Sequence, residues 1–93
     1  MEERLDELLD AFSVLEGRGE LHDFIVDVLS EAELKKLQDR WRAWQLLAAG
    51  LTQTEVSQQT GLSRVTVGRA AKVLERGTGM VRKVVERLDV AHR

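Results

Sequence analysis

Apolar side chains recur three and four positions apart along most of the chain, beginning with Leu5, Leu8 and Leu9. Residues at this spacing share one face of an α-helix, which turns once every ~3.6 residues. β-branched residues do not alternate with polar ones as they do in a strand. The pattern predicts an all-α protein with helices at about 2–16 and 20–29, a third helix that carries Leu34 through Ala48, and three more at about 53–59, 64–76 and 80–91.

Capping residues mark the ends of two neighbouring short helices. Thr52 and Glu55 have the spacing of a capping box, in which each side chain accepts a hydrogen bond from the other residue's backbone N–H. Gly61 can take the positive φ that turns the chain sharply, and Ser63 can cap the next helix. A short helix, a glycine turn and a second helix form a helix-turn-helix, which is predicted at about 52–76.

The second helix of this pair combines an apolar face with a basic one. Val67, Ala70, Ala71 and Leu74 fall on one side, which places Arg64, Val65, Gly68, Arg69 and Lys72 on the other. Residues near the start of a recognition helix reach base edges in the major groove, and later basic residues reach phosphates. Arg64 can donate two hydrogen bonds to guanine, and Val65 can contact a thymine methyl.

Other residues of the predicted helix-turn-helix suit a close approach to DNA. Gly68 lets the backbone come near the duplex, and the free N–H groups and hydroxyls at the start of the first helix suit a phosphate. The predicted DNA-binding residues are therefore Thr52, Gln53, Thr54, Ser63, Arg64, Val65, Gly68 and Lys72.

The charge of the chain is distributed unevenly. The 93 residues carry a formal net charge of −2, with −9 in residues 1–34, +2 in residues 35–61 and +5 in residues 62–93. A basic carboxyl-terminal third can meet double-stranded DNA while the acidic amino-terminal third faces elsewhere. The length fits one domain over residues 1–93.

Composition argues against several other classes of protein. The chain has no cysteine, which excludes disulfides, thiolate zinc sites and iron–sulfur clusters. His22 and His92 are isolated, so no metal site is expected. No apolar run is long enough for a membrane span, and a charged amino terminus predicts a cytoplasmic protein without a secretory signal. Because no nucleophile–base pair and no phosphate-binding glycine loop is found, we expect no enzyme.

Three stretches, residues 29–33, 40–50 and 52–69, resemble the Trp repressor family in their order, caps and spacing. The closing residues 77–79 are more similar to a Trp-repressor-related branch than to the tryptophan-responsive repressor. The resemblance implies an intertwined homodimer of six-helix chains with a helix-turn-helix reading head at each end. It also implies a transcriptional repressor that binds a palindromic operator, with the docking geometry known for Trp repressor.

The same resemblance implies a corepressor, L-tryptophan or another small molecule, between the third helix and the recognition helix. Guanidinium groups suit a carboxylate there, and the positions that match the family's ligand contacts are Ser30, Arg40, Thr66 and Arg69. Ala70 stands where the responsive repressor has glycine, and its methyl group would narrow the indole slot. Ser30 also has the spacing from Glu33 of a capping box.

Two functions fit these residues. The first is a homodimeric DNA-binding regulator, because the apolar stripes together with Trp41 and Trp44 exceed what 93 residues enclose. The alternative is a helical protein-interaction module that uses the helix-turn-helix scaffold without binding DNA, with the acidic first 34 residues as its contact surface. DNA binding would weaken steeply with salt, whereas the interaction module would lack DNA affinity even at low salt.

Overall fold

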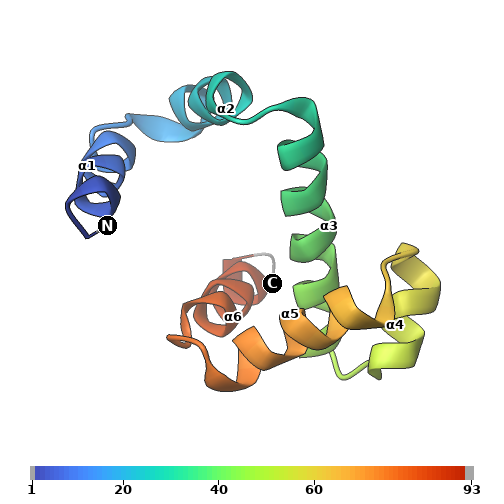
Figure 1. Cartoon of the computed structure of the whole chain (residues 1–93). Helices are drawn as coiled ribbons and strands as arrows, with labels where there is room; N and C mark the ends of the chain where they lie inside the picture. Colours follow the sequence, from blue (N-terminus) through green and yellow to red (C-terminus); the bar gives the residue numbers. More distant parts are fainter. Residues whose placement is uncertain (1, 92–93) are drawn as a thin grey trace. The chain divides into compact units, whose positions relative to one another are not determined.

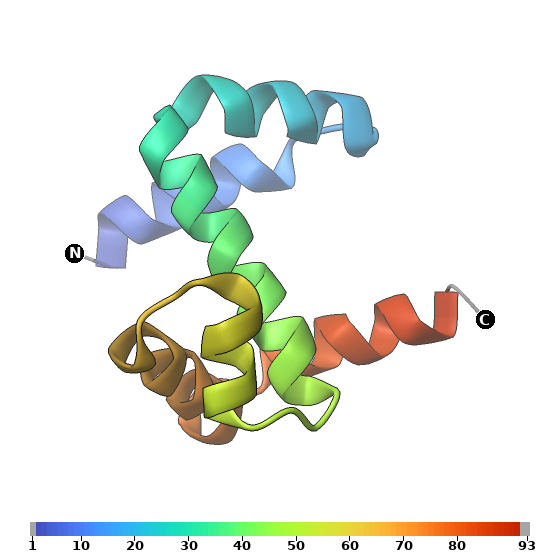
Figure 2. The same cartoon turned by 90° about the vertical axis from the view of Figure 1, so that its right-hand side faces the viewer.

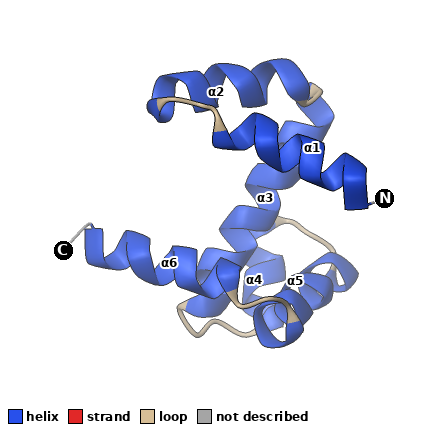
Figure 3. Cartoon of the chain, turned by 90° about the vertical axis from the view of Figure 1, so that its left-hand side faces the viewer, coloured by secondary structure: helices blue, strands red, loops and turns tan. Residues whose placement is uncertain are grey.

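The computed structural model describes residues 2–91, which form six α-helices and contain no strand (Figures 1 and 3). His92 lies outside the described residues. The helices are α1 (Glu2–Ser13), α2 (Gly17–Val28), α3 (Glu31–Ala48), α4 (Gln53–Thr60), α5 (Arg64–Arg76) and α6 (Met80–Ala91). The predicted all-α class is confirmed, and the last three helices begin where the sequence pattern placed them. No helix in this part of the chain is long and apolar enough to cross a membrane.

The break between the first two helices lies earlier than predicted. Residues 17–19 were expected to interrupt the helical pattern, but they form the first turn of α2. At this end of the helix, the Oε1 of Glu20 accepts a hydrogen bond from the backbone N–H of Glu16 at 2.9 Å. This contact satisfies a free donor at the start of α2. The helix begins at Gly17, whose φ of +82° lies in the left-handed region that favours glycine.

The chain divides into two compact units, Met1–Lys35 and Lys36–Arg93. In the first unit, the rings of Phe12 and Phe24 meet edge to face with their centroids 5.3 Å apart. Neither α1 nor α2 has a buried residue, and Leu5 and Leu9 are 54% and 52% exposed. The helices of this unit thus have apolar stripes that its own residues do not cover.

The second unit contains a small core where α3, α4 and α5 meet. Ala43, Val56, Val67 and Ala70 are buried in it, and Trp44 is among the half-buried apolar residues that pack against them. Figure 2 shows α4 and α5 beside the carboxyl-terminal end of α3. This core holds the helix-turn-helix on a single rigid support.

Candidate nucleic-acid interface

The amino terminus of α4 is held by the predicted capping box. The Oγ1 of Thr52 accepts a hydrogen bond from the N–H of Glu55 at 3.1 Å, and the Oε1 of Glu55 accepts one from the N–H of Thr52 at 3.0 Å. Hydrogen bonds from the Thr52 backbone and side chain lower the pKa of Glu55 below its ordinary value, because they stabilise the carboxylate form. The capping box therefore fixes where α4 begins and favours the ionised form of Glu55.

The turn between α4 and α5 is built from a left-handed glycine and small hydroxyl side chains. Gly61 has φ +75° and its N–H donates to the carbonyl of Ser57. The hydroxyl of Ser57 donates to the carbonyl of Leu62 at 2.7 Å, and Thr60 Oγ1 accepts from the Leu62 N–H at 3.2 Å. These bonds tie the turn to α4 on both sides of Gly61 and so set the angle between the two helices.

Ser63 caps α5, as predicted. Its Oγ accepts a hydrogen bond from the N–H of Thr66 at 3.1 Å. The same hydroxyl lies 3.0 Å from the Oγ1 of Thr66 and donates to it. The first turn of α5 is therefore stabilised by contacts within the chain.

The two faces of α5 agree with the sequence pattern. Val67, Ala70 and Leu74 are buried and Ala71 is half-buried. On the outer side the exposed residues are Arg64, Val65, Arg69 and Lys72. An apolar residue such as Val65, 64% exposed at the start of the helix, is well placed to contact another molecule.

The structure brings the start of α4 against the middle of α5. The Oε1 of Gln53 lies 3.6 Å from the position that a Cβ on Gly68 would occupy. Thr52, Gln53 and Thr54 are all exposed. The predicted contacts on α4 and those on α5 thus lie next to one another.

The charge of α5 is strongly positive. Arg64, Arg69, Lys72 and Arg76 accompany a single acidic residue, Glu75. Within residues 2–91, none of these four basic side chains is in an ion pair. They are available to neutralise phosphates.

Arg82 was not singled out by the sequence, but it lies close to this surface. It lines a hollow of about 260 Å³ together with Thr52, Gln53 and Glu75. Because Arg82 belongs to α6, helix-turn-helix spacing contains no signal for it. The one sequence feature that indicated a role for Arg82 is the general excess of basic residues after residue 61.

A separate cleft lies between α3 and α5. It measures about 140 Å³ and is lined by Arg40, Trp44, Thr66, Arg69, Ala70 and Val73. Three of the four predicted ligand residues, Arg40, Thr66 and Arg69, therefore share one cleft. Ser30 belongs to the first unit, where it forms the predicted capping box with Glu33, with bonds of 2.9 and 3.1 Å.

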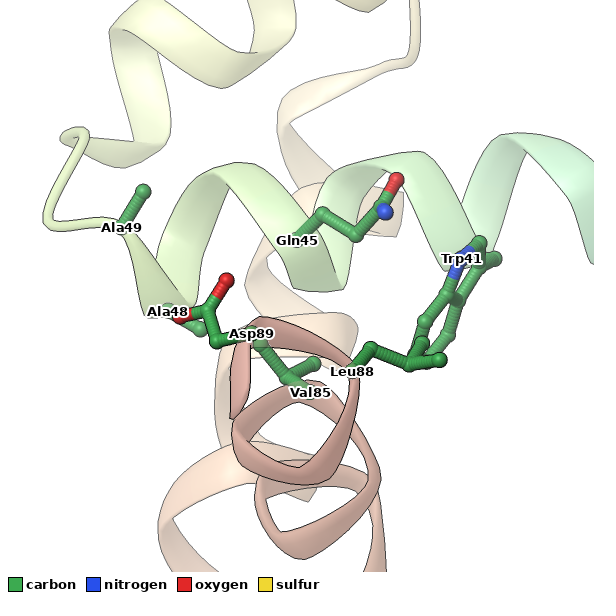
Figure 4. A pocket seen from close by; sticks show the side chains of 7 residues that line it. All are labelled: Trp41, Gln45, Ala48, Ala49, Val85, Leu88 and Asp89. Atoms are coloured by element: carbon green, nitrogen blue, oxygen red, sulfur yellow. The ribbon is translucent and has the colours of Figure 1, made fainter. Parts of the chain in front are cut away.

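A groove of about 200 Å³ lies between α3 and α6 (Figure 4). Figure 4 shows Leu88 of α6 pointing toward the indole of Trp41. Val85, Ala48 and Ala49 complete its apolar lining, and Gln45 and Asp89 are the polar residues beside it. Trp41 thus lines the groove between α3 and α6, whereas Trp44, one helical turn away, lines the cleft between α3 and α5.

A family profile described as Trp repressor protein matches residues 3–89. The chain belongs to the Trp repressor family. Two crystal structures resemble it over 94% of its length with a TM-score of 0.82. One is a candidate Trp repressor from Staphylococcus aureus, 29% identical and covered over 87% of its chain. The other is a TrpR-like protein from Eubacterium eligens, 28% identical and covered over 90%. No curated protein matches the chain significantly.

Membership in the Trp repressor family decides the general kind of function. The family consists of DNA-binding regulators of transcription rather than enzymes. The family match therefore supports a DNA-binding regulator as the general kind of protein for this chain.

Proposed function

We propose that this Trp repressor family member is a homodimeric repressor that binds a palindromic operator through α4 and α5. The observation that carries the proposal is the exposed basic face of α5, whose four cations have no ion-pair partner among residues 2–91. Caps at Thr52 and Ser63 order the start of both helices. A pre-ordered helix presented in this way suits the major groove. Such a repressor would act in the cytoplasm.

In the proposed complex, the residues divide into two roles. Arg64 and Val65 lie in the first turn of α5 and read base edges, guanine through the guanidinium and a thymine methyl through Val65. Thr52, Gln53, Thr54, Ser63 and Lys72 contact the phosphates, and Gly68 admits the backbone close to the duplex.

The proposed dimer is supported by the apolar surface of the single chain. Only Ala43, Val56, Val67, Ala70 and Leu74 are buried among the described apolar residues. Large side chains on α1, including Leu9 and Phe12, are 41–54% exposed. A monomer rarely exposes apolar surface of this extent, and a second copy would cover these stripes together with the groove between α3 and α6. Sedimentation at low micromolar concentration should give twice the monomer mass.

DNA binding can be tested without knowing the operator. Repeated selection from random duplex DNA should enrich a two-fold symmetric sequence, with half-sites about 34–36 Å apart or at a multiple of that distance. Affinity for the enriched site should fall steeply with salt, because each neutralised phosphate releases counterions. Absence of binding to any duplex at low salt would instead favour the protein-interaction module, with the acidic residues 1–34 as its contact surface.

We also propose that the cleft between α3 and α5 binds a small carboxylate. Arg40 and Arg69 supply guanidinium groups and Thr66 a hydroxyl, which together suit a carboxylate. The cleft of about 140 Å³ is close to the ~150 Å³ cavity that holds one benzene molecule. L-Tryptophan is larger than this, and Ala70 forms part of the wall that it would meet.

Calorimetric titration distinguishes the possible ligands. Micromolar binding of L-tryptophan that tightens DNA affinity and disappears in Arg69→Ala would identify tryptophan as the effector. If L-tryptophan produces no heat, small aliphatic carboxylates should be titrated next. No heat from any of them would contradict the proposed carboxylate site and leave a repressor that acts without an effector.

A further inference from the structure

One side-chain hydrogen bond joins α3 directly to the recognition helix. The indole Nε1–H of Trp44 donates to the backbone carbonyl of Ala70 at 3.2 Å, across 26 residues of sequence. Ala70 is only 4% exposed. Its carbonyl also accepts the ordinary helical bond from four residues later, and the indole uses the second lone pair. The contact therefore adds to the bonds of α5 without replacing one.

The indole of Trp44 is restrained by its neighbours. It packs against the core formed by Ala43, Val56, Val67 and Ala70. The ring of Trp41 meets it edge to face, with centroids 6.5 Å apart and planes at 72°. Trp44 is therefore a rigid aromatic group with a defined orientation, and it holds the middle of α5.

The space beside Trp44 is small. The indole forms one wall of the cleft that also contains Arg40 and Arg69, and the remaining volume is about 140 Å³. That volume admits roughly one six-membered ring. Trp44 is thus the largest group between α3 and α5 at the level of Ala70.

We propose that Trp44 is a positioning residue for DNA recognition, and that its hydrogen bond to Ala70 fixes the rotation of α5 relative to α3. This inference rests on the proposed operator binding. Base-edge hydrogen bonds require donor–acceptor distances of about 2.7–3.2 Å, so a small rotation of α5 weakens the contacts of Arg64. Phosphate contacts from long, flexible side chains tolerate such a rotation. Trp44 therefore governs specific binding more than non-specific binding.

The first test compares Trp44→Phe with Trp41→Phe. Both variants keep an aromatic ring in α3, but only the first removes the donor to Ala70. We expect Trp44→Phe to lose about three- to tenfold in affinity for a selected duplex, as for the loss of one hydrogen bond, and to keep its affinity for random DNA. Trp41→Phe should keep the ratio of the two affinities. Sedimentation of each variant shows whether a loss comes from dissociation of subunits.

The second test needs no DNA. Native-state hydrogen exchange of the amides of α5 should accelerate in Trp44→Phe and not in Trp41→Phe, because only one of them releases α5 from α3. In Trp44→Ala, free indole should restore slow exchange and specific DNA binding together. If Trp44→Ala does not fold, Trp44→Phe still decides the matter.

The outcomes separate the two proposals. Unchanged exchange and unchanged specific affinity in a folded Trp44→Phe would overturn the positioning role. Equal losses in a dimeric Trp41→Phe would also overturn it, since that variant keeps both the Trp44 donor and an aromatic ring beside the indole. If the wild-type protein binds no duplex at all, the proposed operator binding fails, and the exchange experiment still tests whether Trp44 holds α5.

Discussion

Gly68 offers a substitution that should stabilise the protein and impair DNA binding at the same time. It lies in the interior of α5 with ordinary helical backbone, where glycine is about 1 kcal/mol less favourable than alanine. A Cβ added at Gly68 would come no closer than 3.6 Å to Gln53 Oε1, which is ordinary van der Waals contact. Gly68→Ala should therefore raise Tm by about 4–8 °C for a protein of this size, measured at fixed protein concentration.

The same methyl group should weaken operator binding if DNA approaches the backbone at Gly68. An extra methyl in a close-packed contact costs about 1–3 kcal/mol, which corresponds to a rise in Kd of roughly fivefold to somewhat over 100-fold. Gly77→Ala is the matched control, because its Cβ would lie 2.6 Å from the Val73 carbonyl oxygen. That variant should lower Tm.

Two results would refute this reasoning. A lower Tm for Gly68→Ala would mean that α4 packs on α5 more tightly than the 3.6 Å contact indicates. A higher Tm with unchanged DNA affinity would remove Gly68 from the DNA-contacting surface, and the position would then have no role that we can assign.

Four further predictions concern base readout, phosphate contact, capping and assembly. Arg64→Ala should cost about 1–3 kcal/mol and relax preference at one base pair in each half-site; equal losses on selected and random duplexes would assign Arg64 to a phosphate instead. Lys72→Ala should weaken all duplexes alike and lower the salt slope by about one. The lowered pKa of Glu55 gives stability that is present above the ordinary pKa of about 4.3 and is lost as pH falls through the lowered value. Thr52→Ala should cost about 1 kcal/mol near neutral pH and flatten this part of the pH dependence of Tm, and an unaltered pH profile would contradict it. Leu9→Asp should halve the sedimenting mass, because a carboxylate would replace a leucine in the proposed interface; a dimer that persists would exclude α1 from that interface.

The bounds of α4 and α5 were predictable because their signals are local. The box from Thr52 to Glu55, the left-handed Gly61 and the cap at Ser63 each act within four residues. The break before α2 was placed a few residues too late. Gly17 does take a positive φ, +82°, but α2 begins at this glycine instead of after Gly19.

The cleft between α3 and α5 was only partly predictable. Arg40, Thr66 and Arg69 were assigned to it through resemblance to a family, not through spacing, since helical periodicity relates residues within one helix only. The bond from Trp44 to Ala70 joins residues 26 positions apart, and it depends on where two helices cross. For the same reason Arg82 was not identified beside Thr52.

The last prediction is that the proposed dimer and the proposed DNA affinity depend on one another. The reading head has its own core in Val56, Val67 and Ala70, whereas neither α1 nor α2 has a buried residue. Loss of the proposed dimer should therefore leave the helix-turn-helix folded, whereas the apolar stripes of α1 and α2 would be exposed to water. Such a monomer keeps the basic face of α5 and hence its salt-dependent binding to random DNA. It loses the second reading head, whose high effective concentration at the neighbouring half-site multiplies the affinity of the first. As the protein is diluted, its occupancy of the specific site should therefore decrease more steeply than its occupancy of random DNA.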